Sequence, residues 1–140
     1  MEHKEISEII IGCAYKVFNE MGFGFLESVY EKCLMIEFKK AGLKAENQQP
    51  IRVLYKGHLV GEFFADIIVE DKIVVELKSV SRLIKAHEVQ LVNYLTATGL
   101  PVGLIINFAE SGVEVKRKVR QLNKHAVAMI SNPVNPVDPV

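Results

Sequence analysis

The chain has 140 residues, of which 49% are hydrophobic and 24% are charged, and its 17 basic and 17 acidic residues give a formal charge of zero. This length and composition are typical of one globular domain, and they exclude a disordered chain or a disulfide-rich scaffold. The zero charge also excludes a global field that would draw the protein onto nucleic acid, so any polyanion must be bound locally.

No apolar run approaches the roughly 20 residues that a membrane-spanning helix needs, and the charged residues 1–5 do not resemble the start of a signal peptide. We therefore expect a cytoplasmic protein without membrane contact. Cys13 and Cys33 fall on the apolar stripes of predicted helices and lack the spacing of a metal or redox pair. We interpret both as reduced, buried thiols.

Two amphipathic helices are predicted first. Apolar residues recur at helical spacing over residues 6–21, and Gly22 follows where a C-terminal cap would lie. The same spacing returns over residues 26–38. This second helix is expected to begin near Glu27 and to end at Gly42, after two lysines that suit a helix C-terminus.

Three strands are predicted next. Residues 51–55 alternate and are rich in β-branched side chains, and the turn signal ending at Gly57 favours a hairpin into a second strand at residues 58–69. Gly61 marks a candidate bulge in that strand. A third strand is expected at residues 73–78, after a short acidic turn.

The second half of the chain alternates between helix and strand. Residues 84–98 are predicted to form a helix and residues 101–108 an apolar strand. Residues 113–119 fit either a last strand or the start of a terminal helix through Ala128, and both interpretations stay open. Residues 131–140 carry a proline at every third position and are expected to form an extended or loose tail.

These elements predict one α/β domain of the α+β type over residues 1–130, with a central mixed β-sheet flanked by helices. The helix between residues 78 and 101 is what a parallel crossover requires, whereas the hairpins must be antiparallel. The sheet should therefore contain both kinds of pairing.

Three ionisable residues interrupt the apolar strands. Glu76 and Lys78 share one face of their strand because side chains alternate. If Ile68 pairs with Val74, then Asp66 lies opposite Glu76. This register requires a connecting loop with an odd number of residues, since a slip of one residue would turn Asp66 to the other face.

Two carboxylates that face each other repel, and burial makes the repulsion worse. Lys78 supplies one positive charge, and a divalent ion such as Mg²⁺ would supply two. Hard ions of this kind bind one or two carboxylates, keep several waters and accept a substrate phosphate. The pattern also fits a salt bridge between Glu76 and Lys78 on an exposed face, with Asp66 capping a turn.

Two further motifs give the pattern a context. Residues 24–30 read G-x-x-E-x-x-Y at the entry to the second helix, and residues 87–94, HEVQLVNY, lie on the helix that follows Lys78. Together with Asp66 and the ELK of residues 76–78, they make the chain resemble the GxxExxY proteins, a prokaryotic group within the PD-(D/E)XK nuclease superfamily. The resemblance covers roughly residues 5–120. It departs from the superfamily's name only where an alanine replaces the proline before Asp66.

The resemblance implies a restriction-endonuclease-like fold that hydrolyses phosphodiester bonds with Mg²⁺ or Mn²⁺, in DNA rather than RNA. By position, it implies that Asp66 and Glu76 are metal ligands and that Lys78 is the catalytic lysine. Glu27 would be a helix carboxylate at the same metal. Gln90 would be the polar residue of the helix that closes the pocket.

Several residues near these motifs are candidate substrate contacts. Gln90 and Tyr94 are four residues apart, and His87 precedes Gln90 by three, so the three form one polar stripe on their helix. Arg82 and Lys85 form a small basic group just before it. Tyr94, His87, Arg82 and Lys85 are therefore predicted to contact substrate.

The sequence also allows other interpretations of these residues and of the function. The helix dipole explains Glu27 in a first turn without any metal. The basic residues at 116–120, and the smaller group of Arg82 and Lys85, fit a solvated face as well as a nucleic-acid contact. The zero net charge also fits a catalytically weak binding module that acts within a larger complex. Since superfamily nucleases often dimerise to cut both strands, a homodimer is also expected.

Overall fold

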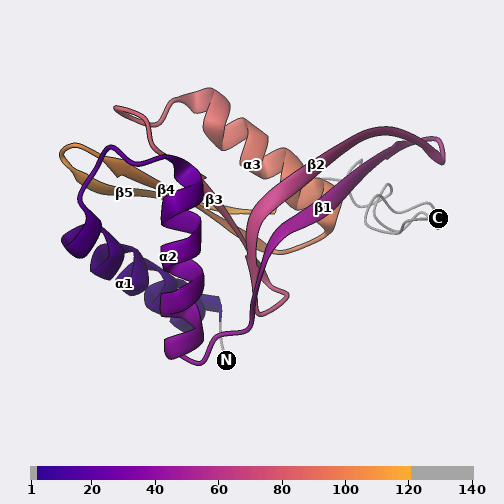
Figure 1. Cartoon of the computed structure of the whole chain (residues 1–140). Coiled ribbons are helices and arrows are strands. Elements are labelled where there is room, and N and C mark those ends of the chain that lie inside the picture. Colours follow the sequence, from indigo (N-terminus) through magenta and orange to yellow (C-terminus); the bar gives the residue numbers. More distant parts are fainter. Residues whose placement is uncertain (1–2, 121–140) are drawn as a thin grey trace.

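A computed structural model describes residues 3–120, and the predicted tail at residues 131–140 lies outside the described residues. The helices and strands in chain order are α1 (His3–Met21), α2 (Glu27–Lys40), β1 (Ala45–Tyr55), β2 (His58–Val69), β3 (Ile73–Lys78), α3 (Lys85–Thr98), β4 (Val102–Ala109) and β5 (Gly112–Val119) (Figure 1). None of the described helices combines the length and apolar character needed to cross a membrane.

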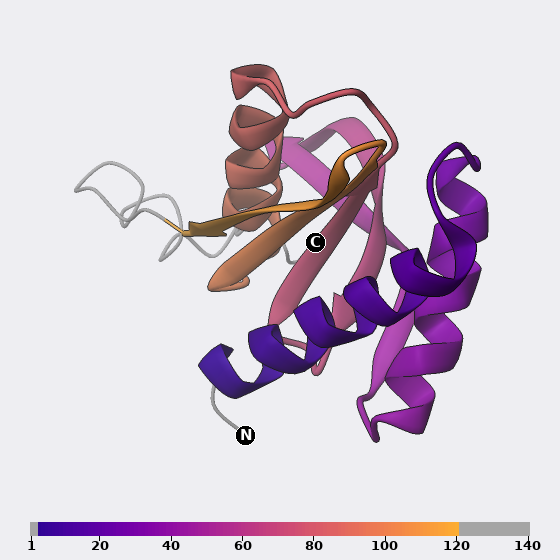
Figure 2. The same ribbon diagram turned by 90° about the vertical axis from the view of Figure 1, so that its left-hand side faces the viewer.

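The five strands form one mixed sheet in the order β1-β2-β3-β4-β5. β3 and β4 are parallel and are connected by α3, whereas each of the other neighbouring pairs is antiparallel. Helices α1 and α2 lie on one side of the sheet and α3 on the other (Figure 2). The predicted mixed sheet flanked by helices is therefore confirmed.

Two apolar cores hold the helices on the sheet. The larger core packs α1 and α2 against alternate strand residues, which include Ile67, Val75 and Leu104. The smaller core packs α3 against the residues of the other parity, such as Val74 and Ile105. A strand buried on both faces needs apolar residues at every position, which explains why β4 is buried throughout its length.

Strand β1 begins six residues earlier than the apolar pattern predicted. Residues 45–50 are polar and contain Pro50, which a central strand would not tolerate. β1 lies at the edge of the sheet, where a missing N–H costs little. Side chains of Asn47 and Gln48 also donate to Glu31 of α2, so tertiary contacts outweigh weak strand propensity.

β5 resolves the alternative left open for residues 113–119. These residues form a strand that pairs antiparallel with β4, from Val102 opposite Val119 to Ala109 opposite Gly112. The turn between them needs a positive φ, which Gly112 supplies at 136°. The strand interpretation is therefore confirmed.

The outer halves of β1 and β2 form a long arm that projects from the body of the molecule (Figure 1). Val53 pairs with Gly61 but Leu54 pairs with Leu59, so Val60 is the extra residue of a bulge. This confirms the irregularity predicted near Gly61. Large apolar side chains, among them Leu59 and Val60, are exposed on the arm.

Candidate active site where strands β2 and β3 diverge

Strands β2 and β3 pair over a short stretch and then separate. The paired residues are Ile67 with Val75, Ile68 with Val74, and Val69 with Ile73, so the connecting loop has three residues. Ile68 lies opposite Val74, which is the register under which the sequence places Asp66 opposite Glu76. Beyond Ile67 the backbone pairing stops, which opens the sheet at Asp66 and Glu76.

Two carboxylates occupy the gap. The N–H of Leu77 donates to Asp66 Oδ2 at 2.8 Å, and the N–H of Asp66 donates to Glu76 Oε2 at 2.9 Å. Each carboxylate therefore satisfies a backbone donor of the opposite strand that would otherwise lack a partner. The two side chains converge between the strands, as the sequence predicts, and neither is turned to the far side of the sheet.

Burial makes this pair electrostatically unfavourable. Glu76 is only 8% exposed, and burial together with the charge of Asp66 raises the pKa of Glu76 to about 8. Burial also raises the pKa of the half-buried Asp66, although its hydrogen bond from Leu77 acts against this. Both carboxyl groups would therefore gain from a nearby cation.

The pair is not neutralised by a salt bridge. Within residues 3–120, neither Asp66 nor Glu76 has a Lys or Arg nitrogen within 4.0 Å. The alternative of an exposed salt bridge between Glu76 and Lys78 is therefore wrong, because Glu76 is buried on the α3 side of the sheet. Lys78 ends β3 and is half-buried, and its charge lowers the pKa of both carboxyls against the larger effect of burial.

Glu27 begins α2, as predicted, and remains exposed in its first turn. In addition to burial, its charge contributes to the raised pKa of Asp66 and of Glu76. No three His, Cys, Asp or Glu side chains in the described part of the chain are grouped closely enough to hold a metal. The structure therefore brings two of the three predicted ligands together and leaves Glu27 outside their immediate group.

The carboxylate pair nevertheless suits a hard divalent ion. Asp66 Oδ1 and Glu76 Oε1 have no hydrogen-bond donor among residues 3–120, because the backbone contacts use the other oxygen of each group. Mg²⁺ commonly binds to protein through one or two carboxylates and keeps water and phosphate in its other positions. Two convergent carboxylates with free oxygens therefore fit the ion that the resemblance implies.

Glu31 is a carboxylate of this region that the sequence analysis missed. It lies one helical turn after Glu27, is 9% exposed, and accepts from Asn47 Nδ2 at 3.1 Å and Gln48 Nε2 at 2.7 Å. Burial is the main cause of the raised pKa of Asp66, and the charge of Glu31 raises that pKa more than the charge of Glu27 does. The spacing of four residues was the available signal, since it places both carboxylates on one face of α2.

Helix α3 brings Tyr94 to the other side of the pair. Burial, followed by the charges of Glu76 and Asp66, raises the pKa of the Tyr94 hydroxyl. Gln90 is exposed and donates from Nε2 to that hydroxyl at 3.2 Å. Among residues 3–120, Gln90 therefore contacts Tyr94 and has no hydrogen bond to Lys78.

The other predicted substrate contacts lie away from the carboxylates. His87 Nδ1 accepts from the N–H of Ile84 at 3.1 Å, so this side chain caps the start of α3. Lys85 and Arg82 are both exposed. Within residues 3–120 none of the three has a hydrogen bond or ion pair with Asp66 or Glu76.

A buried amide fixes the segment that follows Lys78, and sequence reasoning missed it as well. Asn107 is fully buried, and its side chain accepts from the N–H of Val80 and donates to the carbonyl of Val80, both at 2.9 Å. Glu114 Oε1 accepts from Asn107 Nδ2 at 3.2 Å and from the N–H of Leu83 at 3.1 Å. The only sequence signal for this role was that Asn107 is a lone polar side chain within the apolar strand β4.

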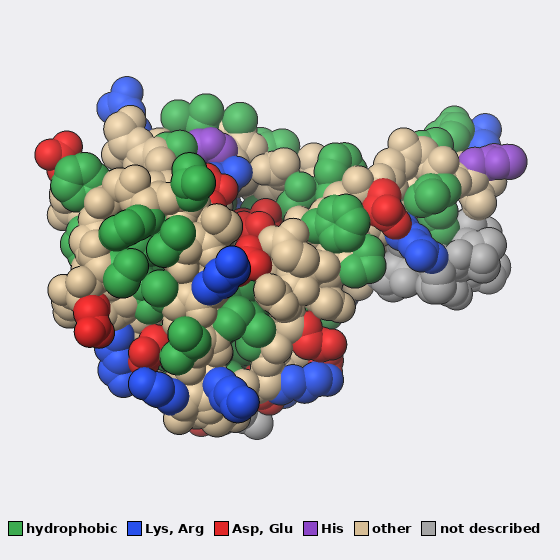
Figure 3. All heavy atoms as spheres, viewed as in Figure 1, with side chains coloured by type: hydrophobic (Ala, Val, Ile, Leu, Met, Phe, Trp, Pro, Cys, Tyr) green, Lys and Arg blue, Asp and Glu red, His purple; other side chains and the backbone are tan. Residues whose placement is uncertain are grey.

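Acidic side chains gather on one face of the molecule. Figure 3 shows acidic side chains gathered between the helical part of the molecule and the base of the arm, with a Lys or Arg side chain beside them. This arrangement is open to solvent on the face that Figure 1 presents.

Comparisons with known proteins agree with this geometry. A family model described as the PD-(D/E)XK nuclease superfamily matches residues 4–121, and the chain belongs to this superfamily. The crystal structure of SSO0001 is similar with a TM-score of 0.55 and 18% sequence identity, over 94% of this chain and 65% of that chain. This likeness supports the restriction-endonuclease-like fold. No curated protein matches the chain significantly.

Proposed function

We propose that the chain is a Mg²⁺- or Mn²⁺-dependent nuclease that hydrolyses phosphodiester bonds in DNA. The observation that carries this proposal is the convergence of Asp66 and Glu76 beside Lys78, at the point where β2 and β3 diverge. Superfamily membership supplies the reaction class. The choice of DNA over RNA, and the place of the chain among the GxxExxY proteins, rest on the resemblance of its motifs.

Each residue of the pair has a proposed role. Asp66 and Glu76 would hold the ion through their free oxygens, while the backbone contacts of the other oxygens fix both side chains. A bound Mg²⁺ would supply a Lewis acid for a phosphate oxygen and a more acidic water. Lys78 would donate a hydrogen bond to the attacking water or to the phosphate, where negative charge develops.

The surrounding residues complete the proposed site. Glu27 would reach the ion through a water rather than directly, because it lies outside the immediate pair. Glu31, held by its contacts with β1, would add a further negative charge near Asp66 that a bound cation would offset. Tyr94, oriented by Gln90, would bound the site on the α3 side.

Phosphates that flank the scissile phosphate would be bound outside the acidic pair. Strand β5 carries basic residues at 116–118, and Arg120 follows its end. Lys85 lies near them, since both Lys85 and Lys116 add to the effect of Lys118 in lowering the pKa of Glu88. Such a local basic surface could contact phosphates despite the zero net charge of the chain.

The test is cleavage by purified protein with single- and double-stranded DNA and RNA in Mn²⁺. Asp66→Asn and Lys78→Ala should each lower the rate at least about 100-fold, because each removes charge stabilisation used in the transition state. Lys4 is an exposed lysine of α1, so Lys4→Ala is the matched control and should cleave DNA normally. Cleavage that survives both site substitutions would belong to a contaminant.

A binding module without strong catalysis is the second candidate. It is favoured by the absence of a three-residue metal group within residues 3–120 and by the zero net charge. Calorimetric titration with Mn²⁺ separates the two functions. Metal binding that Glu76→Ala abolishes supports the nuclease, whereas DNA binding without any metal binding supports the module. Sedimentation of the same samples would test the proposed homodimer.

A further inference from the structure

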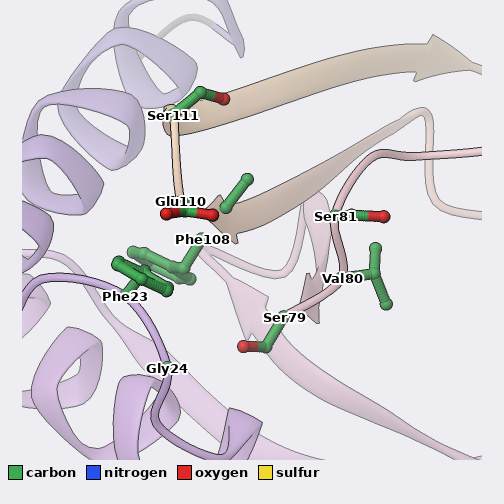
Figure 4. Close-up of a pocket in the computed structure, with 9 residues that line it drawn as sticks. Phe23, Gly24, Ser79, Val80, Ser81, Phe108, Glu110 and Ser111 are labelled. Carbon is green, nitrogen blue, oxygen red and sulfur yellow. The ribbon is translucent and has the colours of Figure 1, made fainter.

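A hollow of about 510 Å³ lies next to Lys78 and has no role in the site described above (Figure 4). It lies just beyond the carboxyl ends of the parallel strands β3 and β4, which is the edge where open α/β sheets commonly bind ligands. Its volume falls within the roughly 300–1,000 Å³ of ordinary ligand sites. The residues that line it are Phe23, Gly24, Ser79, Val80, Ser81, Phe108, Ala109, Glu110 and Ser111.

One wall of the hollow is the loop that leads into α2, and this loop is held in place. The Tyr30 hydroxyl donates to the Gly22 carbonyl at 2.7 Å, and Ser79 Oγ donates to the Phe25 carbonyl at 3.0 Å. Gly24 has a φ of 105°, which a residue with a side chain rarely adopts. Phe23 is thereby presented at the surface, where it is 53% exposed.

The opposite wall and the floor are also fixed. Asn107 holds the backbone of Val80 through two hydrogen bonds of 2.9 Å. On the floor, the buried Phe108 ring stacks on Tyr30 at a centroid distance of 4.1 Å and an interplanar angle of 2°. The hollow is therefore preformed and needs little reorganisation to bind a ligand.

The lining favours a flat, uncharged group over a phosphate. It contains no lysine or arginine, and its charged member is the Glu110 carboxylate, which would repel an anion. Figure 4 shows Phe23 and Glu110 on the same side of the hollow, with Ser79 and Ser81 across from them. An aromatic face with a carboxylate acceptor and serine hydroxyls suits a ring that carries N–H donors on its edge.

We propose that this hollow binds an unpaired nucleobase next to the scissile phosphate, with Phe23 stacking on the base and Glu110 accepting from its N–H donors. This inference rests on the proposed nuclease function. A base can enter the hollow only when it is out of the helical stack, so single strands, frayed ends and flaps become the preferred substrates over intact duplex. Proximity explains the coupling, since Ser79 follows Lys78 directly and also lines the hollow.

Binding of fluorescently labelled oligonucleotides tests the proposal. The parent protein carries Lys78→Ala, so that it binds the oligonucleotides without cutting them. Fluorescence anisotropy in Mg²⁺ gives its affinity for a single strand and for a blunt duplex of the same sequence. A further series of single strands carries one abasic site at successive positions. Adding Phe23→Ala should weaken single-strand binding about tenfold, which is a typical loss for one stacked base, and should change duplex binding less than about twofold. In the parent, an abasic site at one position should lower the single-strand affinity by a similar factor. In the Phe23→Ala variant, the same abasic site should lower the affinity little further, because the stacking contact is already absent.

Two variants serve as controls. Phe23→Tyr keeps an aromatic face and should bind like the parent. Tyr15→Ala removes a comparably exposed ring from α1 that does not line the hollow, and it should also bind like the parent. Unchanged single-strand affinity in Phe23→Ala, or an equal loss for duplex, overturns the base pocket while metal-dependent cleavage by the wild type stands. Absence of both Mn²⁺ binding and cleavage in the wild type overturns the nuclease function, and the base pocket with it.

Discussion

The backbone N–H of Asp66 donates to the side chain of Glu76 at 2.9 Å, in place of the ladder hydrogen bond that two paired strands would share. Leu77 returns an equivalent bond to Asp66 at 2.8 Å. The strands therefore separate without leaving backbone donors unpaired, and the carboxylates that bridge them become the candidate metal ligands. The opening of the sheet and the chemistry of the site have one structural cause.

Glu76→Gln should stabilise the protein at alkaline pH. Folded Glu76 keeps its proton up to about pH 8, whereas a Glu in the unfolded chain releases it near pH 4.5. The folded state thus binds more protons between these values, and wild-type stability falls as pH rises through this window. Without metal, the variant should exceed wild type by about 1–3 kcal/mol at pH 9 and differ little at pH 5. Urea unfolding at both pH values measures this.

The control for that experiment is Glu62→Gln. Glu62 is exposed on the arm and contacts Arg52 at 3.5 Å, so its removal should change stability by less than about 1 kcal/mol. A gain for Glu76→Gln that is equal at pH 5 and pH 9 would show that titration of Glu76 is not its cause.

Affinity for Mn²⁺ should rise with pH between 6 and 8. Because burial and Asp66 raise the pKa of Glu76 to about 8, binding below that pH must displace a proton from the pair. We expect affinity to increase up to about tenfold per pH unit and then level off above pH 8. Calorimetry in two buffers of different ionisation enthalpy counts the released protons. An affinity that is constant from pH 6 to pH 8 would contradict the protonated pair.

Asn107→Ala should destabilise the fold by about 2–4 kcal/mol. The substitution leaves the N–H and carbonyl of Val80 without their partners and removes a donor to Glu114. Asn93→Ala, on the exposed face of α3, should change stability by less than about 0.5 kcal/mol. Urea unfolding compares the two variants, and equal effects would show that the buried amide does not anchor the loop.

Gly103→Ala should cost about 1–3 kcal/mol, because a Cβ built on Gly103 would lie 2.6 Å from Leu91 Cδ1 and force α3 away from β4. Gly12→Ala is the opposite case. A Cβ there meets no atom within 4 Å, and replacing a glycine inside α1 should stabilise the protein by about 0.5–1 kcal/mol. Thermal unfolding of the two variants should therefore shift in opposite directions.

Patterns local to the strands reduced the pairing at the site to a choice of register. If Ile68 pairs with Val74 across a loop of odd length, alternation places Asp66 opposite Glu76, and the structure has this register. The helix starts at Glu27 and near Lys85 were also predicted closely, since apolar periodicity and the preceding turn signals lie within a few residues of each boundary.

Polar segments were predicted less well. Residues 45–50 show no strand pattern, and they become part of β1 because they pair with β2 and bond to Glu31 of α2. Cys33 was expected to be buried but is only partly buried, because it packs against the outside of the larger core rather than within it. Such outcomes depend on which elements meet across the molecule.

The amino-acid order by itself determined the mixed sheet and the shared face of Glu76 and Lys78, because strand alternation is a property of neighbouring residues. It placed Asp66 opposite Glu76 for one register, which the structure has. Only the tertiary structure decided that Glu27 stands outside the immediate pair and that Asn107 fastens the segment after Lys78. Those relations join residues that are distant in the chain. The distances between them depend on how the helices, strands and loops pack together, which no local sequence pattern encodes.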